Sequence, residues 1–305
     1  MQPTNIQTLH TNNSRKNKYR LNIRIEQHGQ DKFFIKSTDS HESSEFLKLL
    51  IYRENLARQF FGREAEVVKG MLKENAIYYP YLPYPTLEDL LIQAIEGGDS
   101  SFGAALIVDY IDFIHKLPNK ICLPEDFMRD FGICSKEIPN PVHCFPIAPI
   151  DCVPSNILIG ERSWYIVDHE WTYEYPIPSD FITYRGIYSL VIRLQDYILY
   201  NISYRHPVVL FCGYGQNRTY IPCSWLELIP SSEISIKQFY FWEHLFQQKV
   251  NINFNSGFLR LKNNPKRLYC VPNIRSWVSI LISKCSGLRR KYYLLFYSIR
   301  DKDNK

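Results

Sequence analysis

Glycine is scarce in this sequence, at only 13 of 305 residues, so a fold built on glycine-rich loops is not expected. No segment contains the roughly 18 uncharged apolar residues in a row that a membrane-spanning helix requires. The N-terminus, Met1 to Asn5, also lacks the basic and then apolar stretch of a secretory signal. These absences predict a cytoplasmic protein.

Paired cysteine motifs are absent as well. The eight cysteines include no C-x-x-C pair, which predicts reduced thiols and gives no support to a structural zinc site. Cys152, with His143 nearby in the sequence, is a weak option for a nucleophile, because no glycines surround it to supply oxyanion donors. Asp168, His169 and Glu170 are consecutive, whereas zinc ligands come from separated positions.

Aromatic side chains are plentiful. They make up 15% of the chain, with 22 tyrosines and 18 phenylalanines, and such residues favour extensive packing faces over disorder. Hydrophobic residues at 45% and charged residues at 22% are ordinary for a globular protein. The length favours two lobes or domains with a large buried interior.

Positive charge is concentrated at the C-terminal end. Residues 260–305 hold twelve lysines and arginines against Asp301 and Asp303, a local charge of +10 in a chain of net charge +5. This basic tail also carries aromatic residues such as Trp277 and Tyr292. Two interpretations stay open: contact with anionic lipids or an acidic partner, and a packed final helix with a solvated basic face. No nucleic-acid-binding motif is present, so nucleic acid is not expected as a partner.

The first eighty residues read as strands with one helix. Residues 19–26 alternate apolar and polar side chains, and after a turn at Gly29 the run Phe33 to Lys36 completes a hairpin that ends on a lysine. Apolar residues then recur at helical spacing from Ser43, and Gly62 ends the helix. Residues 65–71 and 75–81 are predicted strands.

Helices dominate the rest of the chain. The proline-rich connector at residues 80–85 is the predicted lobe boundary. Helices are predicted from Thr86 and over residues 102–115, 181–202 and 236–250, while residues 207–229 are predicted to be irregular with a short strand. A strand is predicted at residues 164–167, and the irregular proline-rich segment 139–149 leads directly into Asp151.

Several polar residues occur in an order that suits phosphoryl transfer from a nucleotide. They are a lysine that ends a strand (Lys36), an acid on the next helix, Asp151 with Asn156 five residues later, and Asp168 after a short strand. Phosphoryl transfer needs a cation on the phosphates, an acid that orients it, oxygen ligands for a divalent ion and a carboxylate for the acceptor proton. Each role is filled once.

The segment Asp151-x-x-Pro154-x-Asn156-Ile157-Leu158, followed by Tyr165 to Trp171, resembles the catalytic loop and metal-binding segment of the protein-kinase-like superfamily. It is most similar to the aminoglycoside and choline phosphotransferase branch. The stretch from Val167 to Trp171, together with Asp180-Phe181-x-x-Tyr184-Arg185-Gly186, is also similar to the kinase part of the bifunctional kinase-methyltransferases that terminate lipopolysaccharide O-antigen chains.

The resemblance implies ATP and Mg²⁺ as cofactors and assigns roles to residues. Asp151 would be the catalytic carboxylate, Asn156 and Asp168 would hold Mg²⁺, and Lys36 would contact the phosphates. Glu54 is the preferred partner of Lys36, and Glu45 is the alternative. The remaining implied contacts are Tyr81 and Leu82 with the nucleotide, and Glu170, Trp171 and Arg185 with the acceptor.

Two features depart from the family pattern. Residues 10–18, where a glycine-rich loop would cover the phosphates, contain no glycine, although Asn13, Ser14 and the pair Arg15 and Lys16 could make side-chain contacts instead. Pro149 stands where most relatives have a histidine. These departures suggest an alternative: a catalytically inactive pseudokinase that serves as a binding component of a polysaccharide assembly complex.

The sequence thus predicts an α+β, two-lobed, protein-kinase-like fold, with a β-rich N-lobe at residues 1–80 and a mainly helical C-lobe at residues 81–305. The predicted activity is phosphorylation of a sugar hydroxyl on a surface polysaccharide of O-antigen or capsule type, or on its precursor. The expected partners are a nucleotide and a saccharide or glycolipid acceptor, with the basic tail at the inner membrane face. A small-metabolite kinase of the aminoglycoside or choline kinase type is a further alternative.

Overall fold

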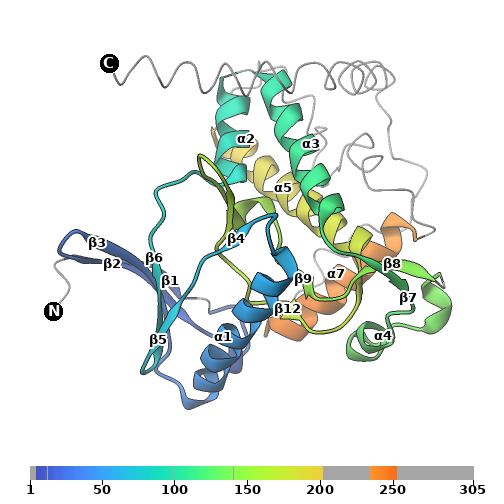
Figure 1. Ribbon diagram of the computed structural model, residues 1–305, viewed down its shortest axis with the longest axis horizontal. Coiled ribbons are helices and arrows are strands. Elements are labelled where there is room, and N and C mark those ends of the chain that lie inside the picture. The colour runs from blue at the N-terminus through green and yellow to red at the C-terminus, as the bar shows by residue number, and fades with distance from the viewer. Residues whose placement is uncertain (1–4, 12, 98, 140, 202–233, 253–305) are drawn as a thin grey trace.

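The computed structural model describes residues 5–11, 13–97, 99–139, 141–201 and 234–252. An antiparallel sheet with one long helix precedes a part that consists mainly of helices (Figure 1). The predicted α+β class, a β-rich N-lobe followed by a mainly helical C-lobe, is confirmed. The boundary between residues 80 and 81 stays a prediction. The basic tail from about residue 260 and the segment 207–229 lie outside the described residues.

The N-terminal sheet has the strand order β1-β2-β3-β6-β5, and each neighbouring pair is antiparallel. Its strands are β1 (Asn5–Thr11), β2 (Asn22–His28), β3 (Asp31–Ser37), β5 (Met71–Lys73) and β6 (Ala76–Pro80). The β2–β3 hairpin agrees with the sequence prediction, and Gly29 makes its turn with a φ of 64°. Lys36 lies on β3, on the opposite face from the buried Ile35.

Helix α1 (His41–Phe61) follows β3 and ends at Gly62, whose φ is 55°. Its buried face repeats at helical spacing and includes Phe46, Leu47 and Leu50. Each such side chain contributes about 1.5–3 kcal/mol by burial. The helix packs against η1 (Asn17–Tyr19), β4 (Glu66–Val67) and β12 (Thr172–Tyr173), so it connects the N-terminal part to the segment after Asp168.

The run from residue 65 to residue 71 is not the single strand that the sequence predicts. β4 pairs in parallel with β11 (Trp164–Ile166), which itself pairs with β10 (Ile157–Ile159), and only from Met71 does the chain rejoin the N-terminal sheet. Gly70 makes this change of partner possible. A Cβ there would lie 2.5 Å from Ile77 Cγ2 and 2.7 Å from a ring carbon of Tyr79.

The helical part agrees with most of the predicted helices. It contains α2 (Leu87–Glu96), α3 (Ser100–Lys116), α4 (Glu125–Phe131), α5 (Ser179–Asn201) and α7 (Ile236–Val250). Short elements connect them: β7 (Lys120–Cys122), η2 (Ser135–Glu137), β8 (Val142–Phe145), β9 (Ala148–Pro149), η3 (Pro154–Asn156) and β13 (Ile177–Pro178). None of the described helices is both long enough and apolar enough to cross a membrane.

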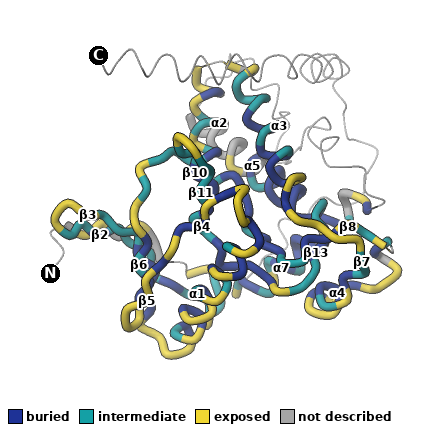
Figure 2. The backbone as a smooth tube through the Cα atoms, viewed as in Figure 1, coloured by how far each residue is buried: buried dark blue, intermediate teal, exposed yellow. Residues whose placement is uncertain are grey.

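Aromatic side chains hold α4, α5 and α7 together. Phe127 of α4, Phe181 of α5 and Trp242 of α7 are fully buried, and the ring of Trp242 lies 5.3 Å from that of Phe127 and 5.6 Å from that of Phe181. Edge-to-face pairs of this kind add about 0.5–1.5 kcal/mol each to the gain from burial. In Figure 2 the tube at α7 and β13 is coloured mainly as buried or intermediate. This packing gives α5 and α7 fixed positions beside the segment that contains Asp151.

Candidate functional site

Asp151 lies in a short loop whose main chain is fixed at several points. The loop leaves β9, which pairs with β12 through Pro149 and Thr172, and the Ile150 N–H donates to the carbonyl of Trp171 at 3.0 Å. Asn156, in η3, donates from its side-chain amide to the carbonyl of Asp151 at 3.0 Å. The loop is therefore closed on itself, and Asp151 and Asn156 keep a fixed relative position.

Asp168 is brought to this loop by the ladder between β10 and β11. The main-chain N–H of Val167, the residue before Asp168, donates to the carbonyl of Asn156 at 3.1 Å. Asp168 Oδ1 accepts from the N–H of Glu170 at 3.1 Å and from Lys36 Nζ at 3.1 Å, and 27% of its side chain is exposed. Asp151, Asn156 and Asp168 line the same cavity.

Lys36 reaches across from the N-terminal sheet to two carboxylates. Its Nζ lies 2.7 Å from Glu170 Oε1 and 3.1 Å from Asp168 Oδ1, and only 3% of the side chain is exposed. Burial disfavours the charge of Lys36, but the two carboxylates outweigh burial, so the pKa of Lys36 is raised. An ammonium group has three donors, and these two contacts leave one for a further acceptor.

The predicted pairing of Lys36 with Glu54 is wrong. Glu54 is buried on α1, but its carboxylate accepts from the main-chain N–H of Gly70 at 2.9 Å and from Arg58 Nη2 at 2.6 Å. Glu170 fills the position beside Lys36 instead. The alternative Glu45 is also excluded, since it pairs with Lys48 on the exposed side of α1.

Glu170 and Trp171, predicted to contact the acceptor, are both buried and do not line the cavity. Glu170 is held by Lys36 and by Arg15, and these cations lower the pKa of its carboxyl to about 2 against the opposing effect of burial. Trp171 is 2% exposed and packs against Tyr19 and Phe46. Glu170 thus orients the cations, and Trp171 belongs to the core.

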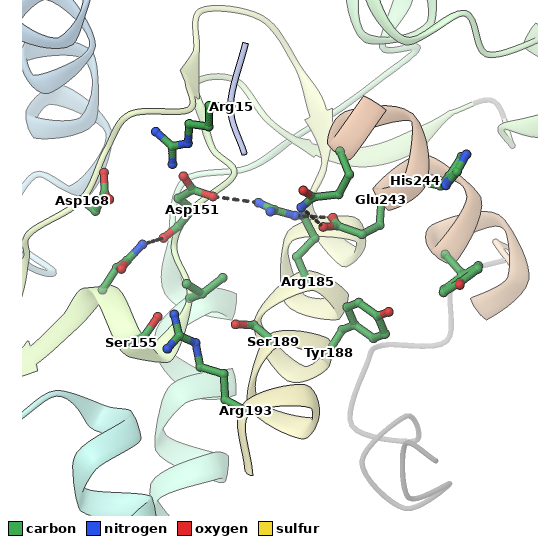
Figure 3. Close-up of a pocket in the computed structure, with 14 residues that line it drawn as sticks. Arg15, Asp151, Ser155, Asp168, Arg185, Tyr188, Ser189, Arg193, Glu243 and His244 are labelled. Atoms are coloured by element: carbon green, nitrogen blue, oxygen red, sulfur yellow. Dashed lines mark hydrogen bonds and ion pairs between the residues drawn. The ribbon is translucent and has the colours of Figure 1, made fainter. Parts of the chain in front are cut away.

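Arg185 lines the cavity, and two of its guanidinium nitrogens contact other groups of the protein. From α5 its Nε donates to Glu243 Oε2 at 2.5 Å, and its Nη1 donates to the carbonyl of Ile150 and lies 3.1 Å from Asp151 Oδ1 (Figure 3). Glu243 is on α7. Arg185 thus connects α7 to the Asp151 loop, and its contact with the acceptor stays a prediction.

Burial of Asp151 raises the pKa of its carboxyl to about 6, with the Arg185 guanidinium opposing the shift and Asp168 adding to it. At neutral pH this carboxylate is ionised and can accept a proton. General bases work best when their pKa lies near the working pH.

The cavity has a volume of about 400 Å³. Figure 3 shows the side chains that line it. Its walls come from the β1–β2 connection, the Asp151 loop, Asp168 and the facing sides of α5 and α7. Tyr188 and Ser189 of α5 and Tyr240 and Gln247 of α7 add hydroxyl and amide groups. This volume is in the range of small-molecule binding pockets, which measure about 300–1,000 Å³.

The predicted nucleotide contacts Tyr81 and Leu82 lie just after β6. The N–H of Tyr81 already donates to the carbonyl of Lys32 at 2.9 Å, and the ammonium group of Lys32 lies 3.9 Å from the centre of the Tyr81 ring. Leu82 is partly buried against the core. The N–H donor of Tyr81 is therefore not open to an adenine ring.

Glu243, Tyr240 and Gln247 were not identified from the sequence as site residues. Their spacing of three and four places them on one side of α7, which is a polar stripe on a helix otherwise rich in aromatic residues. This stripe is a usable signal in the sequence. The sequence does not predict that this face of α7 is turned toward Asp151, because that orientation depends on how α7 packs against α4 and α5.

The sequence matches no protein-family model, and no curated protein sequence is significantly similar to it. Solved structures with a similar arrangement include the choline kinase of Streptococcus pneumoniae, with 11% identity, 93% of this chain and 95% of that chain covered and a TM-score of 0.36. A spectinomycin phosphotransferase in complex with ADP and spectinomycin has 12% identity, coverage of 81% and 90% and a TM-score of 0.34. The macrolide 2′-phosphotransferase of Brachybacterium faecium has 10% identity, coverage of 61% and 70% and a TM-score of 0.33. Similarity this low does not by itself assign an activity.

Proposed function

We propose that this protein is an ATP- and Mg²⁺-dependent phosphotransferase whose acceptor is a sugar hydroxyl of a surface polysaccharide, of O-antigen or capsule type, or of its precursor. The observation that carries the proposal is the convergence at one cavity: Asp151, Asn156 and Asp168 line it, and Lys36 Nζ lies 3.1 Å from Asp168. These groups come from positions 36 to 168 and from both parts of the fold. Their chemistry matches the needs of phosphoryl transfer, which are positioning and neutralisation of charge.

Asp151 would orient the acceptor hydroxyl and take its proton. Its carboxylate faces the cavity, and Arg185 and the fixed main chain of the loop restrict its orientation. A pKa of about 6 keeps it deprotonated at neutral pH without making it a poor base.

Asn156 and Asp168 fit a magnesium ion. Within the described ranges, no group of three or more His, Cys, Asp or Glu side chains is arranged to hold a metal on its own. Mg²⁺ is commonly bound by one or two carboxylates together with substrate phosphates and water, and carboxylate and amide oxygens are the ligands it prefers. When bound, the ion would neutralise negative charge on the phosphates. The third donor of Lys36 would contact a phosphate oxygen.

The acceptor end of the cavity favours a neutral polyhydroxyl compound over an amine. Both oxygens of Glu243 are engaged, one by Arg185 and the other by Gln247 Nε2 at 2.7 Å, and Arg185 also pairs with Asp151. A cationic acceptor would find few carboxylates without a partner there. The hydroxyl and amide groups of Tyr240, Ser189 and Gln247 suit a sugar. This arrangement supports the saccharide over the small cationic metabolite.

The test is transfer of labelled γ-phosphate from ATP to a panel of mono- and oligosaccharides, with choline and an aminoglycoside included. We expect labelled saccharide that requires Mg²⁺, and we expect Asp151→Ala to reduce its formation by at least about 100-fold, the usual contribution of a positioned base. Cys134→Ser, at an exposed position that does not line the cavity, is the control for effects of the purification. A wild-type chain that labels only choline or the aminoglycoside would contradict the saccharide assignment.

The second candidate is an inactive binding component. It is favoured by one observation: Lys36 is buried, with 3% of its side chain exposed, and two of its three donors are held by carboxylates. Calorimetry separates the two candidates, because a phosphotransferase must bind ATP with Mg²⁺, whereas an inactive binding component of this kind would show no Mg²⁺-dependent heat.

A further inference from the structure

The connection between β1 and β2 brings a cation to the cavity. This connection lacks glycine, and Arg15 within it lines the cavity together with Asp151 and Asp168 (Figure 3). The Arg15 guanidinium is 18% exposed and is hydrogen-bonded to Glu170 through Nη1. A guanidinium has five donors, so this single contact leaves donors for a second acceptor.

Main-chain hydrogen bonds to residues 250–252 hold Arg15 in this position. The N–H of Lys16 donates to the carbonyl of Val250 at 3.0 Å, and the N–H of Ile252 donates to the carbonyl of Ser14 at 2.9 Å. Arg15 and Asn251 form the antiparallel bridge between these two bonds. We call this pairing of residues 14–16 with residues 250–252 the strap. It ties the β1–β2 connection to the end of α7, the helix that also carries Glu243.

The surrounding charges explain why Arg15 would stay in place without a ligand. Burial disfavours its charge, but Glu170 and then Asp168 outweigh burial, so the pKa of Arg15 is raised. Lys36 is held by the same Glu170 carboxylate. Two cations, one from β3 and one from the β1–β2 connection, therefore share the Glu170 carboxylate next to Asp168, which is a suitable arrangement for a polyphosphate.

We propose that Arg15 is a further catalytic residue, whose guanidinium contacts the phosphoryl group while it is being transferred. The inference rests on the proposed function. In that reaction the bond from the terminal phosphorus to the bridging oxygen breaks, and the electron pair stays on the ADP oxygen. A bond forms from the acceptor oxygen to phosphorus, and the acceptor proton passes to Asp151. Arg15 supplies, from a side chain, charge stabilisation that main-chain amides of a glycine-rich loop would otherwise give.

The position of Arg15 supports contact with the transferred group over contact with the rest of the nucleotide. Arg15 lines the same cavity as Asp151 and as the α5 and α7 residues at the acceptor end, whereas Lys36 does not line it. The transferred phosphoryl group lies between nucleotide and acceptor at the moment of reaction. A cation that faces both Asp168 and Asp151 is placed for that group.

The experiment is calorimetry on the full chain with Mg²⁺ and ADP, in the presence and absence of aluminium fluoride, which with ADP mimics the phosphoryl group in flight. The wild type should bind the complex at least about 100-fold more tightly than ADP alone, as expected for transition-state analogues. Arg15→Ala should lose most of that gain and keep its affinity for ADP within about threefold, and Arg15→Lys should lie between the two. Lys18→Gln, which removes a charge from η1 of the same connection, should behave as the wild type.

Turnover gives a second readout. We expect Arg15→Ala to lower kcat by about 10³-fold or more, with KM for ATP little changed, since arginines that contact the transferred group have effects of this size. Two results would overturn the assignment of Arg15 while the proposed function stands. In the first, Arg15→Ala still binds the ADP–aluminium fluoride complex about 100-fold more tightly than ADP. In the second, its loss of kcat is accompanied by a large loss of ADP affinity and of thermal stability. A wild-type chain that binds no ADP with Mg²⁺ overturns both the assignment and the proposed function.

Discussion

At the scale of single residues, the site depends on cations and carboxylates that hold one another. Arg185 is the clearest case, because it is buried and contacts Glu243, Asp151 and the carbonyl of Ile150. A buried ion pair contributes little net stability by itself, but removing one partner leaves an unpaired buried charge. Arg185 is therefore a positioning residue for Asp151. Its loss should lower the free energy of unfolding more than the net contribution of the ion pair.

We predict that Arg185→Met lowers the free energy of unfolding by about 3–5 kcal/mol, because it leaves the Glu243 carboxylate buried without its cation. The double variant with Glu243→Gln should recover part of this loss, since neither buried charge of the pair then remains. Urea denaturation of the two single variants and the double variant measures the coupling. Simple additivity of the single effects would show that the two side chains do not act as a pair.

The sequence predicts the set of reacting residues better than their pairing. Asp151, Asn156 and Asp168 follow from local spacing, and they do line one cavity. The partner of Lys36 could not be deduced this way. Glu54 and Glu170 are both buried acids, and either could pair with Lys36. Glu54 does not, because its carboxylate accepts a hydrogen bond from the main-chain N–H of Gly70 at 2.9 Å, a contact between residues that are distant in sequence. Trp171 was misassigned because its burial depends on α1 and the β1–β2 connection.

At the scale of elements, α3 and α5 approach each other closely behind the Asp151 loop. Gly186 of α5 permits this contact, since a Cβ there would lie only 1.8 Å from the hydroxyl oxygen of Tyr110 on α3. That hydroxyl donates to the carbonyl of Cys152 at 2.8 Å. The residue next to Asp151 is thus held by a tyrosine whose position requires a glycine.

We predict that Gly186→Ala destabilises the protein by about 1–3 kcal/mol through overpacking and also lowers the rate of phosphate transfer, because it displaces Tyr110 from Cys152. The matched control is Gly103→Ala on α3, where the new Cβ would lie 3.5 Å from Ala94 Cβ, an ordinary contact. This control should stabilise the helix by up to about 1 kcal/mol. Thermal unfolding and turnover of both variants test the prediction. Equal effects of the two alanines would contradict it.

Elements with a strong apolar period were predictable, and those defined by distant partners were not. Helix α7 occupies residues 236–250 as predicted, because aromatic and aliphatic residues repeat along it. Strand β1 was not predicted, since Ile6 and Leu9 lie three residues apart and do not alternate. The sequence predicts one strand over residues 65–71, whereas β4 pairs with β11, which lies almost a hundred residues further along the chain.

At the scale of the whole molecule, charge is unevenly distributed along the chain. The last forty-six residues carry a local charge of +10, with tyrosines and a tryptophan among the basic residues. We propose that this tail binds the protein to the anionic cytoplasmic face of a membrane. Each lysine or arginine near an anionic surface contributes about 1 kcal/mol to such binding.

We predict that the full chain co-sediments with vesicles containing phosphatidylserine and not with vesicles of phosphatidylcholine alone. Raising the salt concentration from 0.1 M to 0.5 M should weaken the binding, since added salt screens surface charge. Replacing Arg289, Arg290 and Lys291 by glutamate should reduce binding sharply, with phosphate transfer to a soluble acceptor unchanged. Equal binding to both kinds of vesicle would contradict a role for charge.

The strap has a consequence for how the protein is made. Because Arg15 is held by residues at the end of α7, its surroundings cannot be completed until Asn251 has left the ribosome. At synthesis rates of about 5–20 residues per second, that moment comes on the order of ten seconds or more after Arg15 itself emerges. A nascent chain interrupted before Val250 would already contain Lys36 and Asp168 but would lack the partner that fixes Arg15. The cavity that contains Arg15 is therefore completed late in translation.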